Sequence, residues 1–224
     1  DMDGLRKIPG NIDAPWLKEH LGKPVTSIPD PYGCHASFGH HMDAELIDMM
    51  SKTGIEATFR SATDCYADGT FDEGIRHMFR NMQGIIDLVL PTMRPENREG
   101  WFPWLPVCEN CGKVYTTRVE SYDPEAATVT YSCTGSFRDV HGCGHRGTQS
   151  ALGGRGEFFW KADWALRWYV FGVNFEMHGK DLIDSAKLSK DIVKLLGGQP
   201  PNTMFYELFL TEEGRKISKS SGIG

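Results

Sequence analysis

The stretch GEFFWKADWALRWYVFGVNFEM, residues 156–177, decides how the C-terminal part of this chain is interpreted. Three tryptophans spaced four residues apart give 160–171 an apolar face of helical period. A strand candidate follows at 173–177, and a helix at 185–196 is then followed by a short aromatic strand at 204–210. This alternation of helices and strands predicts a parallel α/β half-domain.

The N-terminal part of the chain has a different pattern. Residues 1–31 are rich in Pro and Gly, which is typical of connecting structure. Residues 37–52 and 72–89 each carry apolar side chains at helical spacing, so we predict one helix in each segment.

Between these parts the pattern changes to that of strands. Residues 114–119 and 128–131 alternate apolar and polar side chains, as the two strands of a small antiparallel module would. The chain is therefore divided into three predicted segments. They are a connecting and mainly helical segment at 1–100, a small β module at 101–150, and a parallel α/β half-domain at 151–224.

Composition excludes several classes of protein. With 40% apolar residues in 224, the chain can bury a core, but no apolar run approaches the roughly 20 residues of a bilayer helix. The N-terminus lacks the pattern of a signal peptide, so we expect a soluble cytoplasmic protein without a membrane partner. The formal net charge of -6 leaves no general basic surface for nucleic acid, so any RNA contact must be local or must lie outside this chain.

Four of the six cysteines predict a structural zinc site. Cys108 and Cys111 form a C-x-x-C-G knuckle, and Cys133 and Cys143 follow at a distance typical of zinc ribbons. We favour Cys143 as the fourth ligand because Cys143-Gly144 repeats the turn at Cys111-Gly112. His145 and His141 are the substitutes, and four buried free thiols are the alternative to a metal site. Cys34 and Cys65 are interpreted as ordinary packed or exposed thiols.

A second motif lies near the C-terminus, where GRKISKSSG occupies residues 214–222. Lys216 and Lys219 alternate with the hydroxyls of Ser218 and Ser220, a combination that can surround a polyphosphate. A lysine-rich surface turn is the alternative interpretation.

Taken together, these motifs resemble a known family. Residues 216–220, KISKS, resemble the KMSKS loop of class I aminoacyl-tRNA synthetases, with Ile in place of Met. The opening DMDGLRKIP resembles the D-x-D-G-L-R-K-[VI]-P segment of class I lysyl-tRNA synthetases. The same family resemblance extends, in chain order, to residues 33–39, the C-x-x-C-G knuckle, residues 160–168, Gly179-Lys180-Asp181 and Tyr206-Glu207.

The resemblance implies a fold and an activity. The fold would be the later part of a class I Rossmann-type catalytic domain, interrupted by a helical insertion and a zinc ribbon. Residues 1–100 would be the catalytic-domain connection with the helical insertion, 101–150 the zinc ribbon, and 151–224 the second half of the catalytic domain with its KMSKS-like loop. The activity would be ATP-dependent ligation of L-lysine to tRNA(Lys) through a lysyl-adenylate. Its implied cofactors and partners are structural Zn²⁺, ATP with Mg²⁺, lysine and tRNA(Lys).

The resemblance also implies roles for individual residues. Catalysis would fall to Lys216 and Lys219, which would stabilise the ATP phosphates. The remaining ATP-binding residues would be Ser218, Ser220, Gly179 and Asp181. Trp160 and Tyr206 would line the lysine side chain, since an aromatic face suits an ammonium group. For Trp164 and Trp168 we accept the alternative, a packed apolar stripe.

Two departures from the family pattern stand out. Leu182 occupies the position at which many members carry a histidine that contacts lysine. A HIGH segment is missing ahead of the opening motif, and the similar-looking residues 35–41 follow that motif, so we interpret them as the start of an inserted helix. We therefore expect residues 1–224 alone to be catalytically silent and prone to self-association.

Two other functions remain open at this point. One is another zinc-containing class I synthetase, specific for cysteine, methionine or glutamate. The other is a non-catalytic zinc-ribbon module that binds RNA or protein, which only the KISKS loop and its strand context exclude.

Overall fold

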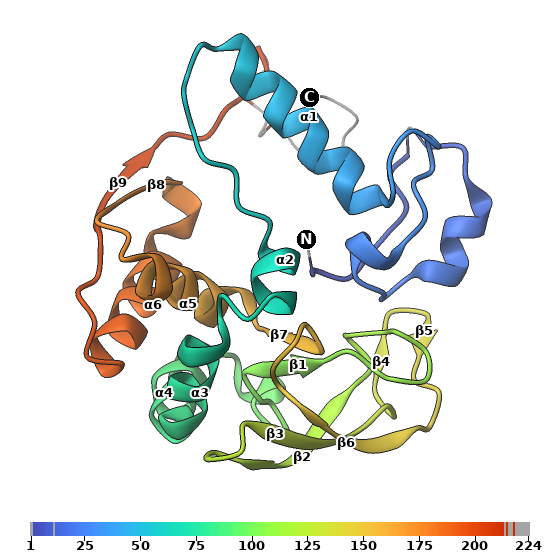
Figure 1. Ribbon diagram of the computed structural model, residues 1–224, viewed down its shortest axis with the longest axis vertical. Helices are drawn as coiled ribbons and strands as arrows, with labels where there is room; N and C mark the ends of the chain where they lie inside the picture. Colours follow the sequence, from blue (N-terminus) through green and yellow to red (C-terminus); the bar gives the residue numbers. More distant parts are fainter. Residues whose placement is uncertain (1, 11, 213, 215–216, 218–224) are drawn as a thin grey trace.

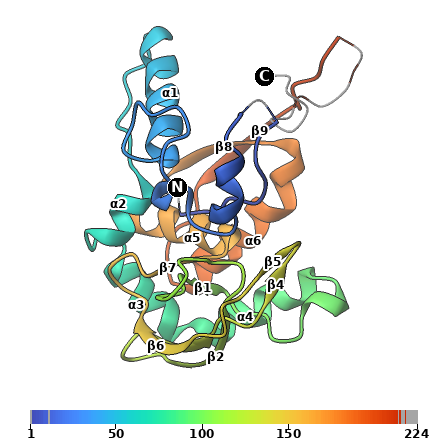
Figure 2. The same cartoon turned by 90° about the vertical axis from the view of Figure 1, so that its right-hand side faces the viewer.

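The computed structural model describes residues 2–10, 12–212, 214 and 217. Figures 1 and 2 place helix α1 at one end of the molecule and an antiparallel sheet at the other. The α-helices are α1 (Phe38–Lys52), α2 (Ala62–Ala67), α3 (Asp72–Arg80), α4 (Met82–Val89), α5 (Trp160–Phe171) and α6 (Ile183–Leu195). Short 3-10 helices are η1 (Pro15–His20), η2 (Val25–Ser27), η3 (Leu90–Thr92), η4 (Pro95–Asn97) and η5 (Lys180–Leu182).

The described strands fall into four small sheets. They are β1 (Trp104–Pro106), β2 (Arg118–Asp123), β3 (Thr128–Ser132), β4 (Ser136–Phe137), β5 (Val140–His141), β6 (Arg146–Ser150), β7 (Gly156–Phe158), β8 (Phe175–Gly179) and β9 (Asn202–Tyr206). Strands β2, β3 and β6 form one antiparallel sheet, whereas β1 pairs with β7 and β4 pairs with β5. The predicted β module is therefore present.

Strands β8 and β9 form the parallel unit that the helix and strand alternation predicts. They pair in register from Phe175 opposite Asn202 to Gly179 opposite Tyr206, and α6 connects them. Helix α5 packs against α6, so both helices belong to the same layer. The fold is thus mixed α/β, with a parallel strand pair in its C-terminal part.

Several predicted boundaries need correction. The single helix predicted at 72–89 is two helices, because Asn81 departs from helical geometry at φ −103° and ψ 15°. The first strand predicted at 114–119 begins only at Arg118. The preceding residues form a turn in which the Thr117 hydroxyl donates to Val114 O at 2.7 Å. Helices α1, α5 and α6 confirm their predictions to within two residues.

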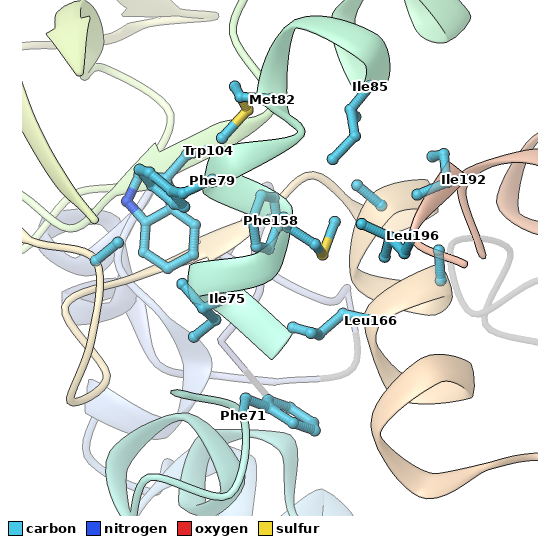
Figure 3. Close-up of a cluster of buried hydrophobic side chains, with 14 of the residues drawn as sticks. Phe71, Ile75, Phe79, Met82, Ile85, Trp104, Phe158, Leu166, Ile192 and Leu196 are labelled. Carbon is cyan, nitrogen blue, oxygen red and sulfur yellow. The ribbon is translucent and has the colours of Figure 1, made fainter. Parts of the chain in front are cut away.

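The main core lies between the helices and strands β1 and β7 (Figure 3). Phe79 on α3 contacts Trp104 and Phe158, with ring centroids 5.7 and 6.1 Å apart. On the other side, Ile85 on α4 lies near Ile192 on α6 (Figure 3). This core joins side chains from all three predicted segments, so the segments pack as one body.

A smaller core holds the opening segment against α1. Leu5, Leu17, Ile28 and Phe38 are buried together there. Helix α1 begins after Ser37, whose side-chain oxygen accepts a hydrogen bond from His40 N as an N-cap. Among the described residues, no helix is both long and apolar enough to cross a lipid bilayer.

Candidate functional site

The four predicted zinc ligands converge on one point at the edge of the antiparallel module. The Sγ atoms of Cys108, Cys111, Cys133 and Cys143 all lie within 4.8 Å of one another. Gly112 and Gly144 follow the second cysteine of each pair with φ angles of +71° and +81°, a left-handed conformation that glycine adopts readily. Gly112 N donates to Cys108 O at 2.8 Å, which closes the knuckle turn.

The spacing of the sulfurs fits a tetrahedral metal. Zn–S bonds of ~2.3 Å at tetrahedral angles place neighbouring sulfurs about 3.8 Å apart. Cys108 and Cys143 are 3.7 Å apart between sulfurs, and so are Cys111 and Cys133. The cysteines are free thiols, not disulfides. The cluster can therefore bind a zinc ion through four thiolates, with no ligand position left for water.

The surroundings of the thiols differ. Burial raises the pKa of the Cys111 thiol to about 12. In contrast, the Asn110 amide, which donates to Cys143 Sγ at 3.3 Å, lowers the pKa of that exposed thiol to about 6. Neither histidine substitute joins the group: His145 lies 4.0 Å from the Glu109 carboxylate, and His141 Nδ1 lies 2.9 Å from the Ser136 hydroxyl.

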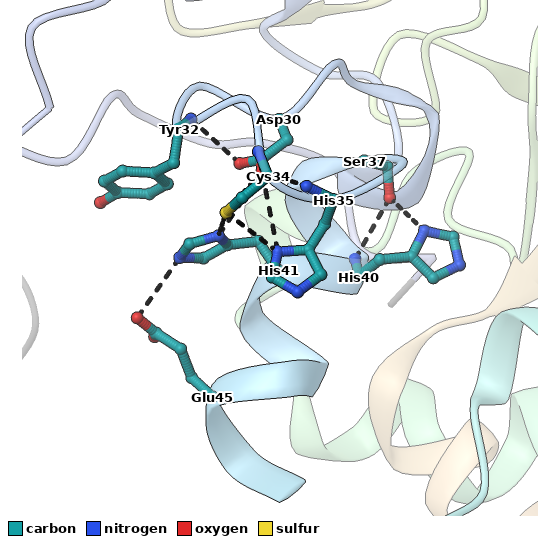
Figure 4. Close-up of polar contacts among 8 residues, drawn as sticks. All are labelled: Asp30, Tyr32, Cys34, His35, Ser37, His40, His41 and Glu45. Carbon is teal, nitrogen blue, oxygen red and sulfur yellow. Dashed lines mark hydrogen bonds and ion pairs between the residues drawn. The ribbon is translucent and has the colours of Figure 1, made fainter. Parts of the chain in front are cut away.

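A second group of metal-ligand side chains lies at the start of α1 (Figure 4). Asp30, Cys34, His35 and His41 each offer one ligand atom within 4.8 Å of the others. Cys34 Sγ lies 3.1 Å from His35 Nδ1 and 3.2 Å from His41 Nδ1. One carboxylate, one thiol and two imidazoles form a ligand set that zinc accepts.

Asp30 is held rigidly at the centre of this second group. Its carboxylate accepts backbone hydrogen bonds from Tyr32, Cys34 and His35 at 3.1, 2.9 and 2.8 Å. Burial alone would raise the pKa of Asp30, but these three N–H groups outweigh it and keep the pKa well below its usual value. The Tyr32 ring stacks on His41 with centroids 4.2 Å apart.

The sequence prediction missed this group, since it treated Cys34 as an isolated thiol. The D-x3-C-H-x5-H spacing of residues 30–41 was the available signal. It was hidden because residues 35–41 were interpreted only as the start of a helix. That helix start is correct, but its first turn also carries His41 into the group.

A cavity of about 250 Å³ lies beside Trp160, one of the two predicted lysine-contacting residues. Its lining includes Asp3, Glu157, Trp160, Asp163, Trp164 and Arg167. Leu182, the position at which the predicted family often has histidine, also lines it. The cavity therefore combines an aromatic wall with three carboxyl groups and one guanidinium.

The buried Asp163 pairs with the half-buried Arg167 in the cavity wall. Asp163 is 6% exposed, and its two oxygens contact Arg167 Nη2 at 2.6 Å and the Tyr66 hydroxyl at 2.7 Å. Burial raises the pKa of Asp163, whereas Arg167 and Tyr66 lower it. Tyr66 also accepts a hydrogen bond from Phe158 N at 3.2 Å, so it fixes helix α5 against strand β7.

Tyr115 connects the opening segment to the cysteine module. Its hydroxyl accepts hydrogen bonds from Gly4 N and Arg6 Nε at 3.1 and 3.0 Å, and donates to Asp3 Oδ1 at 3.4 Å. A Cβ atom on Gly4 would lie 2.7 Å from the Tyr115 ring, so only glycine permits this approach. Asp3 thus reaches the cavity through a segment that Tyr115 holds.

Gly179, Asp181 and Tyr206 come together at a second position, at the ends of β8 and β9. Gly179 pairs with Tyr206 in the parallel register, and Tyr206 is 41% exposed. Asp181 follows in η5, one residue before Leu182. Tyr206 is not among the residues that line the Trp160 cavity. Lys216, Ser218, Lys219 and Ser220 lie outside the described residues.

Comparisons with known proteins assign this chain to a family. A family model described as tRNA synthetases class I (K) matches residues 1–224. A lysine–tRNA ligase of Rickettsia africae (strain ESF-5) is 42% identical over 224 residues, which cover 99% of this chain and 41% of that protein.

A more distant relative shows the same pattern of coverage. The lysine–tRNA ligase of Cenarchaeum symbiosum is 39% identical over 226 residues, which cover 99% of this chain and 43% of that protein. The chain therefore spans less than half the length of these relatives. Because the family model matches every residue, the chain belongs to the class I tRNA synthetases of the lysine type.

Proposed function

We propose that the full-length protein carrying residues 1–224 activates L-lysine with ATP and transfers it to tRNA(Lys). The observation that carries this proposal is the cavity beside Trp160, in which aromatic side chains and carboxyl groups line a space of about 250 Å³. Such a lining suits an amino acid with an apolar stem and a cationic end.

The proposed reaction needs no covalent nucleophile on the protein. The lysine carboxylate would attack the α-phosphate of ATP in line, and pyrophosphate would leave, so that lysyl-adenylate forms. Lys216 and Lys219 would stabilise the charge that develops on the phosphates, Ser218 and Ser220 would shape their loop, and Mg²⁺ would accompany ATP. Gly179 and Asp181 would line the ATP pocket.

Trp160 and Tyr206 would both contact lysine. They lie on α5 and β9, and Tyr206 ends the strand beside Gly179. The parallel β8–β9 pair would continue into a Rossmann-type sheet, with 1–100 as connection and helical insertion and 101–150 as a zinc ribbon. Phe175, Met177 and Phe205 are about half exposed on these two strands, at 52%, 50% and 55%, as expected of a sheet that is covered further.

Zinc would be structural in this protein. Cys108, Cys111, Cys133 and Cys143 would hold one ion, and the Asp30, Cys34, His35 and His41 group would hold a second. Each ion would fix a loop that has little core of its own. A cytoplasmic location agrees with the need for reduced thiols.

Lysine-dependent exchange of pyrophosphate into ATP, measured on the full-length protein, tests the proposal. We expect exchange with lysine but not with cysteine, methionine or glutamate. Lys219→Ala should lower the exchange rate far more than it weakens lysine binding, because its ammonium meets charge that develops in the transition state. A preference for one of the other amino acids would reassign the substrate. Failure of the protein to bind ATP at all would favour a non-catalytic RNA- or protein-binding module.

A further inference from the structure

Glu157 is one of the buried charged residues of the described chain. It lies in the middle of strand β7, whose three residues are all buried, and pairs with Leu105 of β1. Its side chain is 7% exposed, and it lines the cavity beside Trp160. The backbone register of β7 therefore fixes where this carboxyl group lies.

Glu157 is also incompletely paired. Within the described part of the chain, its buried Oε1 atom has no hydrogen-bond partner. Burying a carboxylate without a partner is costly, and such groups are rare in folded proteins. Burial raises the pKa of Glu157 well above its usual value, and the nearby carboxyl groups of Asp3 and Asp163 raise it further. The guanidinium of Arg167 lowers the pKa, but the effects that raise it dominate, so negative charge outweighs positive charge around Glu157.

Arg167, the cationic side chain among the described residues that line the cavity, is shared between carboxyl groups. Arg167 is engaged by Asp163 at 2.6 Å, and Asp163 is also bonded to Tyr66. Three carboxyl groups and one guanidinium line the space, so a ligand with a positive charge would improve the balance.

The shape of the cavity restricts the kind of cation. Trp160 and Trp164 stack with ring centroids 5.9 Å apart and supply an apolar wall. A volume of about 250 Å³ is below the range for drug-sized ligands, so the space suits a small molecule. A bare metal ion would leave the aromatic wall unused, whereas a primary alkylammonium would use both features.

We propose that Glu157 accepts a hydrogen bond from the ε-ammonium group of lysine and is the residue that selects a cationic side chain over a neutral one of the same length. This inference rests on the proposed function. In the full-length protein, Glu157 would gain its missing partner when lysine binds, and Trp160 would contact the methylene stem.

Pyrophosphate exchange with Glu157→Gln tests this role, because the amide keeps the shape of the side chain and removes its charge. We expect the KM for lysine to rise on the order of 10- to 100-fold, the range for a hydrogen bond to a charged group. The KM for ATP and kcat should change less than about threefold. Norleucine, which lacks the ammonium group, should inhibit the variant and the wild type about equally.

Glu176→Gln is the matched control. Glu176 accepts a hydrogen bond from Trp168 Nε1 at 2.8 Å, outside the residues that line the cavity, and should keep the wild-type KM for lysine. An unchanged lysine KM in Glu157→Gln, or equal losses for lysine and norleucine, would overturn the inference. If circular dichroism shows that Glu157→Gln does not fold, Glu157→Asp is measured by the same criteria. A wild-type protein without lysine-dependent exchange would instead refute the proposed function.

Discussion

Tyr66→Phe should destabilise the contact between helix α5 and strand β7 more than its single lost atom suggests. Tyr66 is fully buried. Its hydroxyl donates to Asp163 at 2.7 Å and accepts from Phe158 N at 3.2 Å. Phenylalanine keeps the ring, which packs edge-on against Phe71 with centroids 5.0 Å apart, and removes both hydrogen bonds.

The expected loss follows from these two bonds. A hydrogen bond to a charged carboxylate contributes about 1.5–3 kcal/mol, and a buried N–H left without a partner costs about 1–3 kcal/mol. We therefore expect the local opening free energy of this region to fall by about 3 kcal/mol or more. That loss corresponds to about a 100-fold faster exchange of the Phe158 amide.

Hydrogen–deuterium exchange of the full-length protein, followed in a peptide that covers strand β7, measures this loss. Tyr122→Phe is the control, since no hydrogen bond from its hydroxyl occurs among the described residues, although its ring packs near Phe79 at 6.4 Å. We expect the control to change the exchange rate less than about threefold. Equal protection of β7 in Tyr66→Phe and wild type would refute the reasoning that the hydroxyl joins α5 to β7.

Three further predictions concern the cavity and the metal groups. Without lysine, Glu157→Gln should be more stable than wild type above about pH 5, because a raised pKa makes the wild-type carboxyl stabilising only while it is protonated. Thermal unfolding from pH 4 to pH 8 should show the advantage growing with pH, and a constant difference would contradict it. Elemental analysis should find two zinc ions per chain. Cys111→Ser should lose one ion and His41→Ala the other, whereas the control Cys65→Ser should retain both. A single ion in the wild type would exclude zinc at the Asp30, Cys34, His35 and His41 group. Tyr115→Phe should raise the KM for lysine about threefold to tenfold, as expected for a neutral hydrogen bond, with the KM for ATP unchanged; an unchanged lysine KM would show that Asp3 needs no such support.

The helices were predictable because their apolar residues repeat at the helical period. Helix α5 begins and ends where the tryptophan spacing predicts, and α1 begins one residue later than predicted. The break at Asn81 was not predictable in this way, because apolar residues on both sides continue the same period. There the Asn81 amide donates to His77 O at 2.9 Å, which lets the side chain satisfy the end of α3.

The two metal groups differ in how much the sequence reveals. The cysteine group is visible because Cys108 and Cys111 lie on one turn and Cys143-Gly144 repeats the Cys111-Gly112 pattern. Asp30, Cys34 and His35 lie in an irregular loop, and His41 lies on the helix that follows. Only the folding of that loop around the Asp30 carboxylate brings the four side chains together.

The residues of the cavity beside Trp160 were the hardest to predict. The family resemblance pointed to Trp160, which lines this cavity, but Glu157 gave only a weak signal, a single charge inside the apolar stretch GEFF. The position of Glu157 in the cavity wall depends on the pairing of β7 with β1, which lies about fifty residues earlier in the chain. Long-range pairing of this kind cannot be deduced from local spacing.

The position of Tyr115 gives the cysteine module a role in the cavity. Tyr115 follows the first knuckle by four residues, and Val114 N donates to Gly22 O at 2.8 Å beside it. Two adjacent residues of the module therefore hold the opening segment. The Tyr115 hydroxyl accepts from Gly4 and Arg6, and the Val114 amide donates to Gly22. Asp3 is 63% exposed at its side chain and has little packing of its own, so its place at the cavity depends on these contacts. A loosened knuckle would consequently disturb the cavity beside Trp160 before it disturbed the main core, which the helices and strands β1 and β7 form independently of the four thiols.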